Sequence, residues 1–333
     1  MEDAVLVLGG AGYIGSHMVK LLAERGRPCC VIDDFSTGWK EALAVSAIEG
    51  PIQDPSVVKQ ALDTSSATAA IHFASRIQVA ESVRDPALYY LDNVGNTISL
   101  LDTVCRRGLK HFIFSSSAAT YGEPQRVPIA EDHPTHPLSP YGRTKLIVEQ
   151  ILPDYERAYG LKWVALRYFN AAGAHPDASI GERHDPETHL IPLSLRVASG
   201  RLQHLSVYGS DYPTADGTCV RDYVHVWDLA NAHLLALEYL ERGGASRAFN
   251  LGNGNGCSVK EVIASVERVT GRRIAVVYGP RRPQDPAALV ADASQARQLL
   301  GWRPAYSDLD TIVAHAWAWE QKLGVIGSPT TRG

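Results

Sequence analysis

A glycine-rich turn near the start of the chain constrains its fold more than any other feature. An apolar run at residues 4–8 leads into Gly9, Gly12 and Gly15, spaced as G-x-x-G-x-x-G, and a helical pattern follows. Glycines let the backbone turn tightly and approach a pyrophosphate, while the helix directs its free N–H groups and positive dipole end at that charge. The motif predicts a dinucleotide-binding turn, although a turn that only packs a helix on a strand carries similar glycines.

Asp33 strengthens the dinucleotide interpretation. It ends the second apolar run, 18 residues beyond Gly15, close to the spacing of about 20 for an acid that binds the adenosine ribose hydroxyls. An acid here repels a 2′-phosphate and Asp34 adds a second negative charge, so the sequence favours NAD over NADP. Asp34 is explained equally well as the start of a turn toward residues 36–38.

The first half of the chain alternates short apolar runs with amphipathic stretches. The apolar runs predict buried parallel strands at residues 4–8, 28–32, 69–73, 111–114 and 163–166. Helical patterns lie between them at 14–24, 55–62, 86–105 and 141–159. This order predicts an α/β fold with a doubly wound parallel sheet of the Rossmann type, in which right-handed crossovers place helices on both faces.

The second half of the chain has a looser rhythm, with loops rich in Gly and Pro at 173–186, 210–217, 252–256 and 279–286. We expect residues 1–172 to form the NAD-binding domain, with 221–256 returning to it. Residues 173–220 and 257–326 are then expected to form a smaller mixed α/β C-terminal domain for the substrate. Residues 327–333 are expected to form a frayed tail.

Composition and charge exclude several function classes. Hydrophobic residues make up 45% and charged residues 20%, as in ordinary globular proteins, and a net charge of −4 gives no basic footprint for nucleic acid. No apolar run approaches the roughly 18 residues of a membrane span, and the N-terminus lacks a secretion signal, so we expect a cytoplasmic protein. The five cysteines fit neither a disulfide framework nor a zinc site, and we predict reduced thiols and no metal.

Tyr141 and Lys145 form a Y-x-x-x-K pattern at the start of a helix that follows Pro140. Residues four apart share one helix face, and an ammonium near a phenol favours the phenolate, which draws its pKa down from about 10. Tyr141 can then take or return the proton of a substrate hydroxyl. Ser117 follows the fourth apolar run, and we predict that its hydroxyl positions that proton; capping of the loop backbone is its alternative role.

Several further runs resemble the extended short-chain dehydrogenases and, within them, the UDP-glucose 4-epimerase family. The resemblance covers nearly the whole chain. The runs 72–74, 81–83, 114–118 and 139–142, like the glycine turn, are shared by many nucleotide-sugar enzymes. Those of the second half are 167–170, 173–176, 211–214, 216–218 and 220–226, of which the last, VRDYVHV, is the most epimerase-like.

The resemblance implies a tightly held NAD, hydride removal from C4 of a UDP-hexose, turning of the 4-keto sugar and hydride return to its other face, a reaction of galactose metabolism. The implied catalytic residues are Tyr141, Lys145 and Ser117. The residues implied to bind the cofactor are Gly9, Gly12, Tyr13, Ile14, Gly15, Asp33, Asp34, Ser36, Thr37, Gly38, Ile52, Phe73, Ala74, Ser75, Asn93, Ser115, Tyr141, Lys145 and Tyr168. Those implied to bind the UDP-sugar are Ser117, Tyr141, Asn170, His189, Leu190, Tyr208, Arg221, Arg282, Asp285 and Leu289, with Tyr208 against the uracil and both arginines at the diphosphate.

Some positions depart from the family pattern. Leu8 stands where the family usually has Thr, residues 50–52 where it has an acid near the adenine, and residues 75–78 where some members have a lysine that approaches the cofactor. Leu289 is intermediate in size at the position that gates the 2-substituent of the sugar, so a UDP-N-acetylglucosamine substrate stays open, as does a UDP-pentose (xylose or arabinose).

Rival functions on the same scaffold are a 4,6-dehydratase and a non-catalytic NAD sensor. A dehydratase is expected to carry an Asp-Glu pair where this chain has Ala118 and Ala119, and sensors tend to lose the Tyr and Lys that this chain keeps. The family is commonly dimeric through the helices that carry Asn93 and Tyr141. The apolar residues between 147 and 152 supply either that interface or a core-facing stripe.

Overall fold

The largest element of the computed structural model, which describes residues 3–282 and 285–326, is a seven-stranded sheet. Its strands pair in parallel in the order β11–β6–β5–β4–β1–β2–β3. The predicted doubly wound α/β fold is confirmed, and each of the five predicted strands is present. The strands are β1 (Val5–Leu8), β2 (Cys29–Asp33), β3 (Ala47–Glu49), β4 (Ala69–His72), β5 (His111–Ser117), β6 (Lys162–Tyr168) and β11 (Arg247–Leu251).

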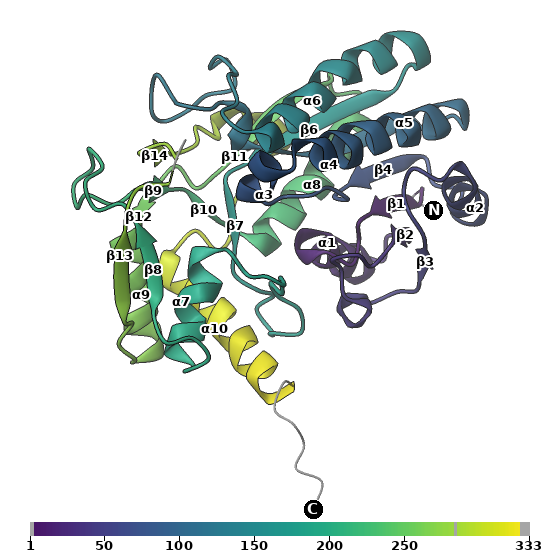
Figure 1. Ribbon diagram of the computed structural model, residues 1–333. Coiled ribbons are helices and arrows are strands. Elements are labelled where there is room, and N and C mark those ends of the chain that lie inside the picture. The colour runs from purple at the N-terminus through teal and green to yellow at the C-terminus, as the bar shows by residue number, and fades with distance from the viewer. Residues whose placement is uncertain (1–2, 283–284, 327–333) are drawn as a thin grey trace, which may run out of the picture.

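Helices cover both faces of this sheet (Figure 1). Along β1, Val5 and Val7 lie in one core with α1 and α8, whereas Leu6 and Leu8 lie in the other core with α2, α5 and α6. This alternation follows from the two-residue period of a strand, and burial on both faces explains why the strands read as continuous apolar runs. The helices are α1 (Tyr13–Glu24), α2 (Pro55–Ser65), α5 (Asn96–Arg106), α6 (Pro140–Tyr159) and α8 (Val226–Glu241).

The predicted helix over residues 86–105 is present, but it is not α-helical throughout. The segment consists of α4 (Pro86–Tyr89), a π-helical turn over Tyr90–Gly95, and α5. Asn93 in this turn is buried, accepts a hydrogen bond from the N–H of Arg76 and donates one to Thr144 Oγ1 at 3.1 Å. We attribute the wider turn to these polar contacts with neighbouring elements, which apolar periodicity does not report. The short helix α3 (Val79–Arg84) was not predicted either.

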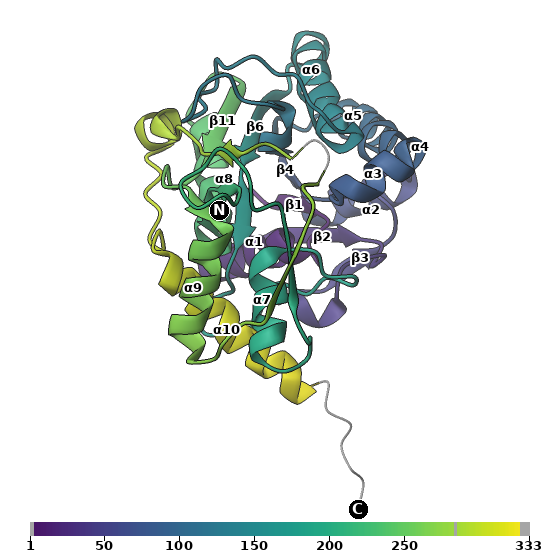
Figure 2. The same cartoon turned by 60° about the vertical axis from the view of Figure 1, so that its left-hand side comes forward.

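A smaller mixed α/β part completes the chain, as predicted (Figure 2). Helices α7 (Leu190–Ala198), α9 (Val259–Thr270) and α10 (Leu309–Ile326) share a core with β8 (Leu205–Tyr208), which pairs in parallel with β13 (Val276–Gly279). Two small sheets complete it. One joins β7 (Asn170–Ala172) to β10 (Tyr223–His225), and the other places β9 (Val220–Arg221) between β12 (Cys257–Ser258) and β14 (Ala288–Leu289).

The chain returns to the large sheet late, since α8 packs on it and β11 pairs with β6. The proposed boundaries at 172/173, 220/221 and 256/257 remain our domain proposal, and the expected tail at 327–333 lies outside the described residues. Short helical turns lie at Lys40–Ala42, Ala118–Thr120 and Ala296–Leu300. Within the described residues, no helix is long and apolar enough to cross a membrane.

Candidate functional site

The glycine turn has the shape that a dinucleotide site needs. Gly9 has a φ of +75°, and a Cβ there would lie 2.6 Å from the backbone nitrogen of Ala74. A Cβ on Gly15 would lie 2.2 Å from the carbonyl oxygen of Gly9, whereas one on Gly12 would meet only that oxygen, at 3.4 Å, among the described residues. Gly12 caps α1 without a side chain. Gly9 and Gly15, where a side chain would clash, therefore shape the turn, and Gly12 leaves the N-terminus of the helix open to an anion.

The next two residues of the turn face the protein. Ile14 packs against the core shared with α1. The hydroxyl of Tyr13 donates a hydrogen bond to the carbonyl oxygen of Gly173 at 2.7 Å, and its ring meets the edge of His184. If Tyr13 and Ile14 bind the cofactor as proposed, they therefore do so through their backbone N–H groups and not through their side chains.

Asp33 braces the glycine turn. Its two carboxylate oxygens accept hydrogen bonds from the N–H groups of Ala11, at 2.8 Å, and Phe35, at 2.9 Å. Burial raises the pKa of Asp33, and these two hydrogen bonds oppose the rise. Asp34 is exposed and accepts from the N–H and hydroxyl of Ser36, so the turn interpretation describes Asp34. Thr37 is exposed and Gly38 half-buried, and a Cβ on Gly38 would lie 2.7 Å from that of Ala11, so this loop touches the glycine turn.

Phe73, Ala74 and Ser75 follow the end of β4, and Ser115 and Tyr168 lie near the ends of β5 and β6. Ile52 follows β3 but is buried in the core with α2. The N–H groups of Phe73 and Ala74 donate to Leu8 at the end of β1. Within the described residues, the Ser75 hydroxyl next to them is buried without a hydrogen-bond partner. A buried polar group is normally satisfied, so this hydroxyl, together with the open glycine turn, fits a site for NAD.

Tyr141, Lys145 and Ser117 meet at the end of β5. Ser139 caps α6, and Tyr141 and Lys145 lie one turn apart on its buried face. The ammonium of Lys145 donates to the carbonyl oxygen of Ser115 at 2.8 Å and lies 5.9 Å from the centre of the Tyr141 ring. Ser117 hydrogen-bonds to the Tyr141 hydroxyl and also accepts from the N–H of Ala119 at 3.1 Å. Ser117 therefore contacts both the Tyr141 hydroxyl and the loop backbone, and its role in proton transfer stays a prediction.

The pKa of Tyr141 does not follow the expectation. Burial raises the pKa of the phenol, and the hydrogen bond with Ser117 only partly offsets this rise. Burial also lowers the pKa of Lys145 to about 7, against the opposing charge of Glu149. The expectation that Lys145 brings the pKa of Tyr141 into the working range is therefore wrong for the protein alone, because both groups are desolvated together. Tyr168 lies close to both Tyr141 and Ser115, and burial raises its pKa as well.

Four of the proposed substrate residues lie around the loop after β13, and the others lie elsewhere. Arg221 forms an ion pair with Asp285, and the guanidinium of Arg282 lies 4.2 Å from the centre of the Tyr208 ring, so two arginines stand with an acid and an aromatic ring at the loop after β13. Leu289 packs with the cluster that contains Ala118, next to Ser117. Asn170 is half-buried, and its N–H donates to the carbonyl oxygen of Asp222.

His189 belongs to a cluster that the sequence analysis missed, while Leu190 simply begins α7. Glu182, His184, Glu187 and His189 place their ligating atoms within 4.8 Å of one another. Burial opposes protonation of both imidazoles, but the two carboxylates outweigh it and raise the pKa of His184 to about 9 and that of His189 to about 10. The alternation of Glu and His over eight residues was the available signal.

A buried ion pair was also missed. Arg167 on β6 donates from Nε to both carboxylate oxygens of Glu149 on α6, at 3.0 and 3.1 Å. Glu149 also accepts from the Ser116 hydroxyl, and Arg167 donates to the hydroxyl of Tyr121 at 3.0 Å. Glu149 lies one helical turn beyond Lys145, so this pair connects the sheet to the lysine that the sequence analysis proposes as catalytic.

Comparison with known proteins agrees with this geometry. Residues 5–252 match the NAD dependent epimerase/dehydratase family. The chain is 49% identical over 320 residues to the UDP-glucose 4-epimerase of Halalkalibacterium halodurans, covering 96% of each protein. It is similar to the crystal structure of the UDP-glucose 4-epimerase of Brucella ovis in complex with NAD, with a TM-score of 0.92, 52% identity and coverage of 95% and 98%. The UDP-Glc/GlcNAc 4-epimerase of Campylobacter jejuni gives a TM-score of 0.83, 42% identity and coverage of 96% and 100%.

Proposed function

The chain belongs to the NAD-dependent epimerase/dehydratase family, and from this premise we propose that it interconverts UDP-galactose and UDP-glucose by inverting C4. The observation that carries the proposal is the meeting of Tyr141, Lys145 and Ser117 at the end of β5, at the same edge of the sheet as the glycine turn. Relatives named UDP-glucose 4-epimerase, about half identical over nearly the whole chain, support it.

The residues of this chain act on the proton at O4 of the sugar. A bound NAD would supply the hydride chemistry, that is, removal of the hydride from C4 and its return to the opposite face of the 4-keto sugar. Tyr141 takes the hydroxyl proton as the hydride leaves and gives it back as the hydride returns. Ser117 holds the Tyr141 hydroxyl in place, and Lys145, anchored on the Ser115 carbonyl, would favour the phenolate when its ammonium is protonated. The positive charge of a bound nicotinamide ring would add to this effect.

The nucleotide has to stay fixed while the sugar turns. We propose that Arg221 and Arg282 hold the diphosphate, because a forked guanidinium suits bidentate contacts with phosphate, and that Tyr208 lies against the uracil. The partly exposed ring of Tyr208, 41% exposed, supports this role. Asn170, His189, Leu190, Asp285 and Leu289 are proposed to complete the UDP-sugar contacts.

The range of sugars is a narrower proposal. Leu289 lies against the cluster of Ala118 and Phe169 and is smaller than an aromatic gate, and the Campylobacter jejuni relative is named for both glucose and N-acetylglucosamine substrates. We therefore propose slow turnover of UDP-N-acetylglucosamine beside UDP-hexose turnover. UDP-xylose is included in the test because inversion at C4 makes little use of C6.

The test is turnover of UDP-galactose to UDP-glucose by the purified protein without an added oxidant. Tyr141→Phe is expected to lose on the order of 100-fold to 10,000-fold in rate, the usual worth of positioned proton transfer. Tyr159→Phe, which alters an exposed tyrosine on the same helix, serves as the matched control. No turnover of any UDP-sugar, with NAD supplied, would leave the NAD sensor as the better proposal.

We also propose a homodimer in the cytoplasm, acting in galactose metabolism. Val148 and Leu152 are fully buried in the core, so they do not supply the interface. Leu91 and Ile98 are 63% and 43% exposed, and they support a dimer formed through the π-helical turn and α5. Ile98→Asp should convert a dimer into a monomer in light scattering. Five free cysteines support a compartment that keeps thiols reduced.

A further inference from the structure

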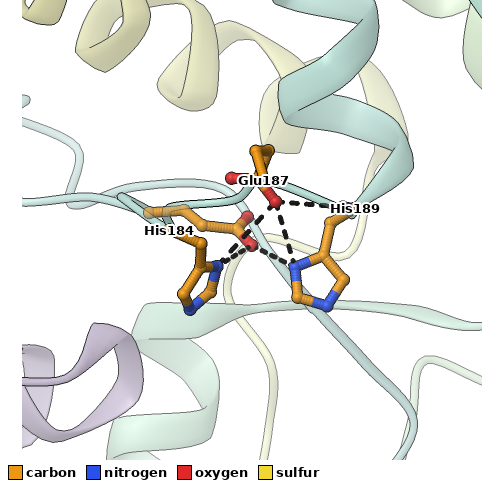
Figure 3. Close-up of side chains that lie close together, drawn as sticks. His184, Glu187 and His189 are labelled. Carbon is orange, nitrogen blue, oxygen red and sulfur yellow. Dashed lines mark hydrogen bonds and ion pairs between the residues drawn. The ribbon is translucent and has the colours of Figure 1, made fainter. Parts of the chain in front are cut away.

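Four side chains in the segment before α7 converge on one point. Glu182, His184, Glu187 and His189 each offer a ligating atom, and all of these atoms lie within 4.8 Å of one another. Figure 3 shows His184 and His189 each turning one ring nitrogen toward the carboxylates between them. In both rings that nitrogen is Nδ1, so two imidazoles and two carboxylates face a common centre.

The spacing of these atoms matches four-coordinate geometry. Zinc binds imidazole nitrogen and carboxylate oxygen at about 2.0 to 2.2 Å, usually as a tetrahedron, which separates neighbouring ligand atoms by roughly 3.4 Å. His184 Nδ1 lies 3.1 Å from Glu182 Oε1 and 3.8 Å from Glu187 Oε1. His189 Nδ1 lies 2.5 Å and 3.5 Å from the same two oxygens. A displacement of about 1 Å at His189 would bring its shorter separation to the tetrahedral value, and the other three separations already lie within about 0.4 Å of that value.

Charge and burial give an independent argument. The side chains of Glu182 and Glu187 are 5% and 1% exposed, and buried carboxylates need compensating positive charge. In the part of the chain that the structure describes, the two imidazoles are their ion-pair partners. One divalent cation balances two carboxylates and leaves both imidazoles neutral, which is the form that binds metal.

Glu187 is prepared for such a role. Its Oε1 accepts hydrogen bonds from the N–H groups of Thr188, at 2.8 Å, and His189, at 2.9 Å. Backbone contacts of this kind fix the orientation of ligating carboxylates. Its other oxygen, Oε2, is buried and has no hydrogen-bond partner among the described residues, so a second coordination position is free on the same carboxylate.

We propose that Glu182, His184, Glu187 and His189 form a binding site for one divalent transition metal ion, with zinc as the best-fitting ion. Calcium and magnesium prefer all-oxygen sites of higher coordination number, whereas a set of two nitrogens and two oxygens suits zinc. The sequence analysis predicted no metal, because its search covered cysteine spacings. The proposal uses no step of the proposed epimerase reaction, so either can fail alone.

The metal would fix the conformation of a segment that contacts both the part with the large sheet and the smaller mixed α/β part. The indole N–H of Trp39, beside the glycine turn, donates to the carbonyl oxygen of Arg183 at 3.0 Å. The indole N–H of Trp319 on α10 donates to the carbonyl oxygen of Glu182 at 2.8 Å. Four protein ligands leave no position for a reacting molecule, so the site is structural, and it fixes His189 at the start of α7.

The test measures zinc binding by the full-length protein. The protein is stripped with a chelator, dialysed against zinc and analysed for metal content, and its thermal unfolding is recorded with and without zinc. We expect one zinc per chain and a higher Tm with zinc. Glu182→Gln and His184→Gln should weaken zinc binding about 100-fold or more, since even an outer hydrogen-bond partner of a ligand is worth about 10- to 100-fold. His204→Gln, which changes an exposed histidine, should bind as wild type does.

Cobalt(II) gives a readout that needs no variant. Four-coordinate cobalt in the wild-type protein should absorb strongly in the visible range, and added zinc should remove that absorption. The weak absorption of six-coordinate cobalt, a zinc content far below one per chain, or equal zinc affinity in wild type and both cluster variants would each overturn the proposal.

Discussion

Replacing Glu149 by glutamine removes the anion that faces a buried guanidinium. Its side chain is 6% exposed and that of Arg167 is 10% exposed, and Arg167 donates to both of its carboxylate oxygens. Breaking one side of a buried ion pair costs about 3 to 5 kcal/mol because the other charge stays buried. An unfolding entropy of about 2.1 cal/mol/K per residue gives about 0.7 kcal/mol/K for this chain, so Tm should fall by about 4 to 7 °C.

The thermal unfolding of Glu149→Gln is compared with that of a double variant, Glu149→Leu with Arg167→Met. The double variant removes both charges and should recover most of the lost Tm, because neither charge of the ion pair is left buried alone. A single variant that melts within about 1 °C of wild type, or a double variant that loses as much as the single one, would refute the reasoning. Glu149 also raises the pKa of Lys145, so the single variant should lose the protonated lysine at a lower pH.

Three further predictions concern the proposed site. Gly15→Ala should weaken NAD binding at least about tenfold, since its Cβ would lie 2.2 Å from the Gly9 carbonyl oxygen and would deform the turn. Fluorescence titration measures this, with Gly324→Ala as the control because a Cβ there meets no atom of the described residues within 4 Å. The pKa of Lys145 is about 7 in the folded protein, against an ordinary value of 10.5. The unfolded chain therefore holds that proton more tightly, and the stability of the fold rises with pH between these values. In urea unfolding, wild type should gain about 2 kcal/mol of stability relative to Lys145→Met from pH 7 to pH 9, and no gain would contradict the burial argument. Ser117→Ala removes a hydrogen bond that lowers the pKa of Tyr141, so turnover of UDP-galactose by this variant should be slower and should reach its maximum at a higher pH. An unchanged pH profile would leave Ser117 with the capping role alone.

The sequence predicted what depends on local pattern. Continuous apolar runs identify strands buried on both faces, and the positions of Gly9, Asp33 and Tyr141 follow from strand ends and helix starts, so the fold was predictable and these residues fall at the same sheet edge. Contacts between distant segments were not predictable. Arg167, the partner of Glu149, lies 18 residues away on a neighbouring strand. We attribute the π-helical turn within residues 86–105 to contacts such as the hydrogen bond from Asn93 to Thr144, a residue of another helix.

The same limit explains the pKa of Tyr141. The spacing of Tyr141 and Lys145 indicates that the two groups are neighbours, but it carries no information on how far each is desolvated. Both are buried, and burial disfavours the charged form of each, so the pKa of Tyr141 rises, that of Lys145 falls, and the two values move apart. The histidine and glutamate cluster before α7 was hidden for a different reason, since only the path of that segment brings its four side chains together.

Asp33 has a consequence for how the cofactor is held over time. Its carboxylate accepts hydrogen bonds from both Ala11 and Phe35, and the N–H of Trp39 donates to the carbonyl oxygen of Ala11. The turn proposed to receive the pyrophosphate is therefore ordered by the protein's own contacts. A ligand that meets a preorganised loop loses little conformational entropy on binding, and the gain in affinity is expressed mainly as slow dissociation. We therefore expect the residence time of the dinucleotide to depend on Asp33, a side chain whose own hydrogen bonds go to the backbone.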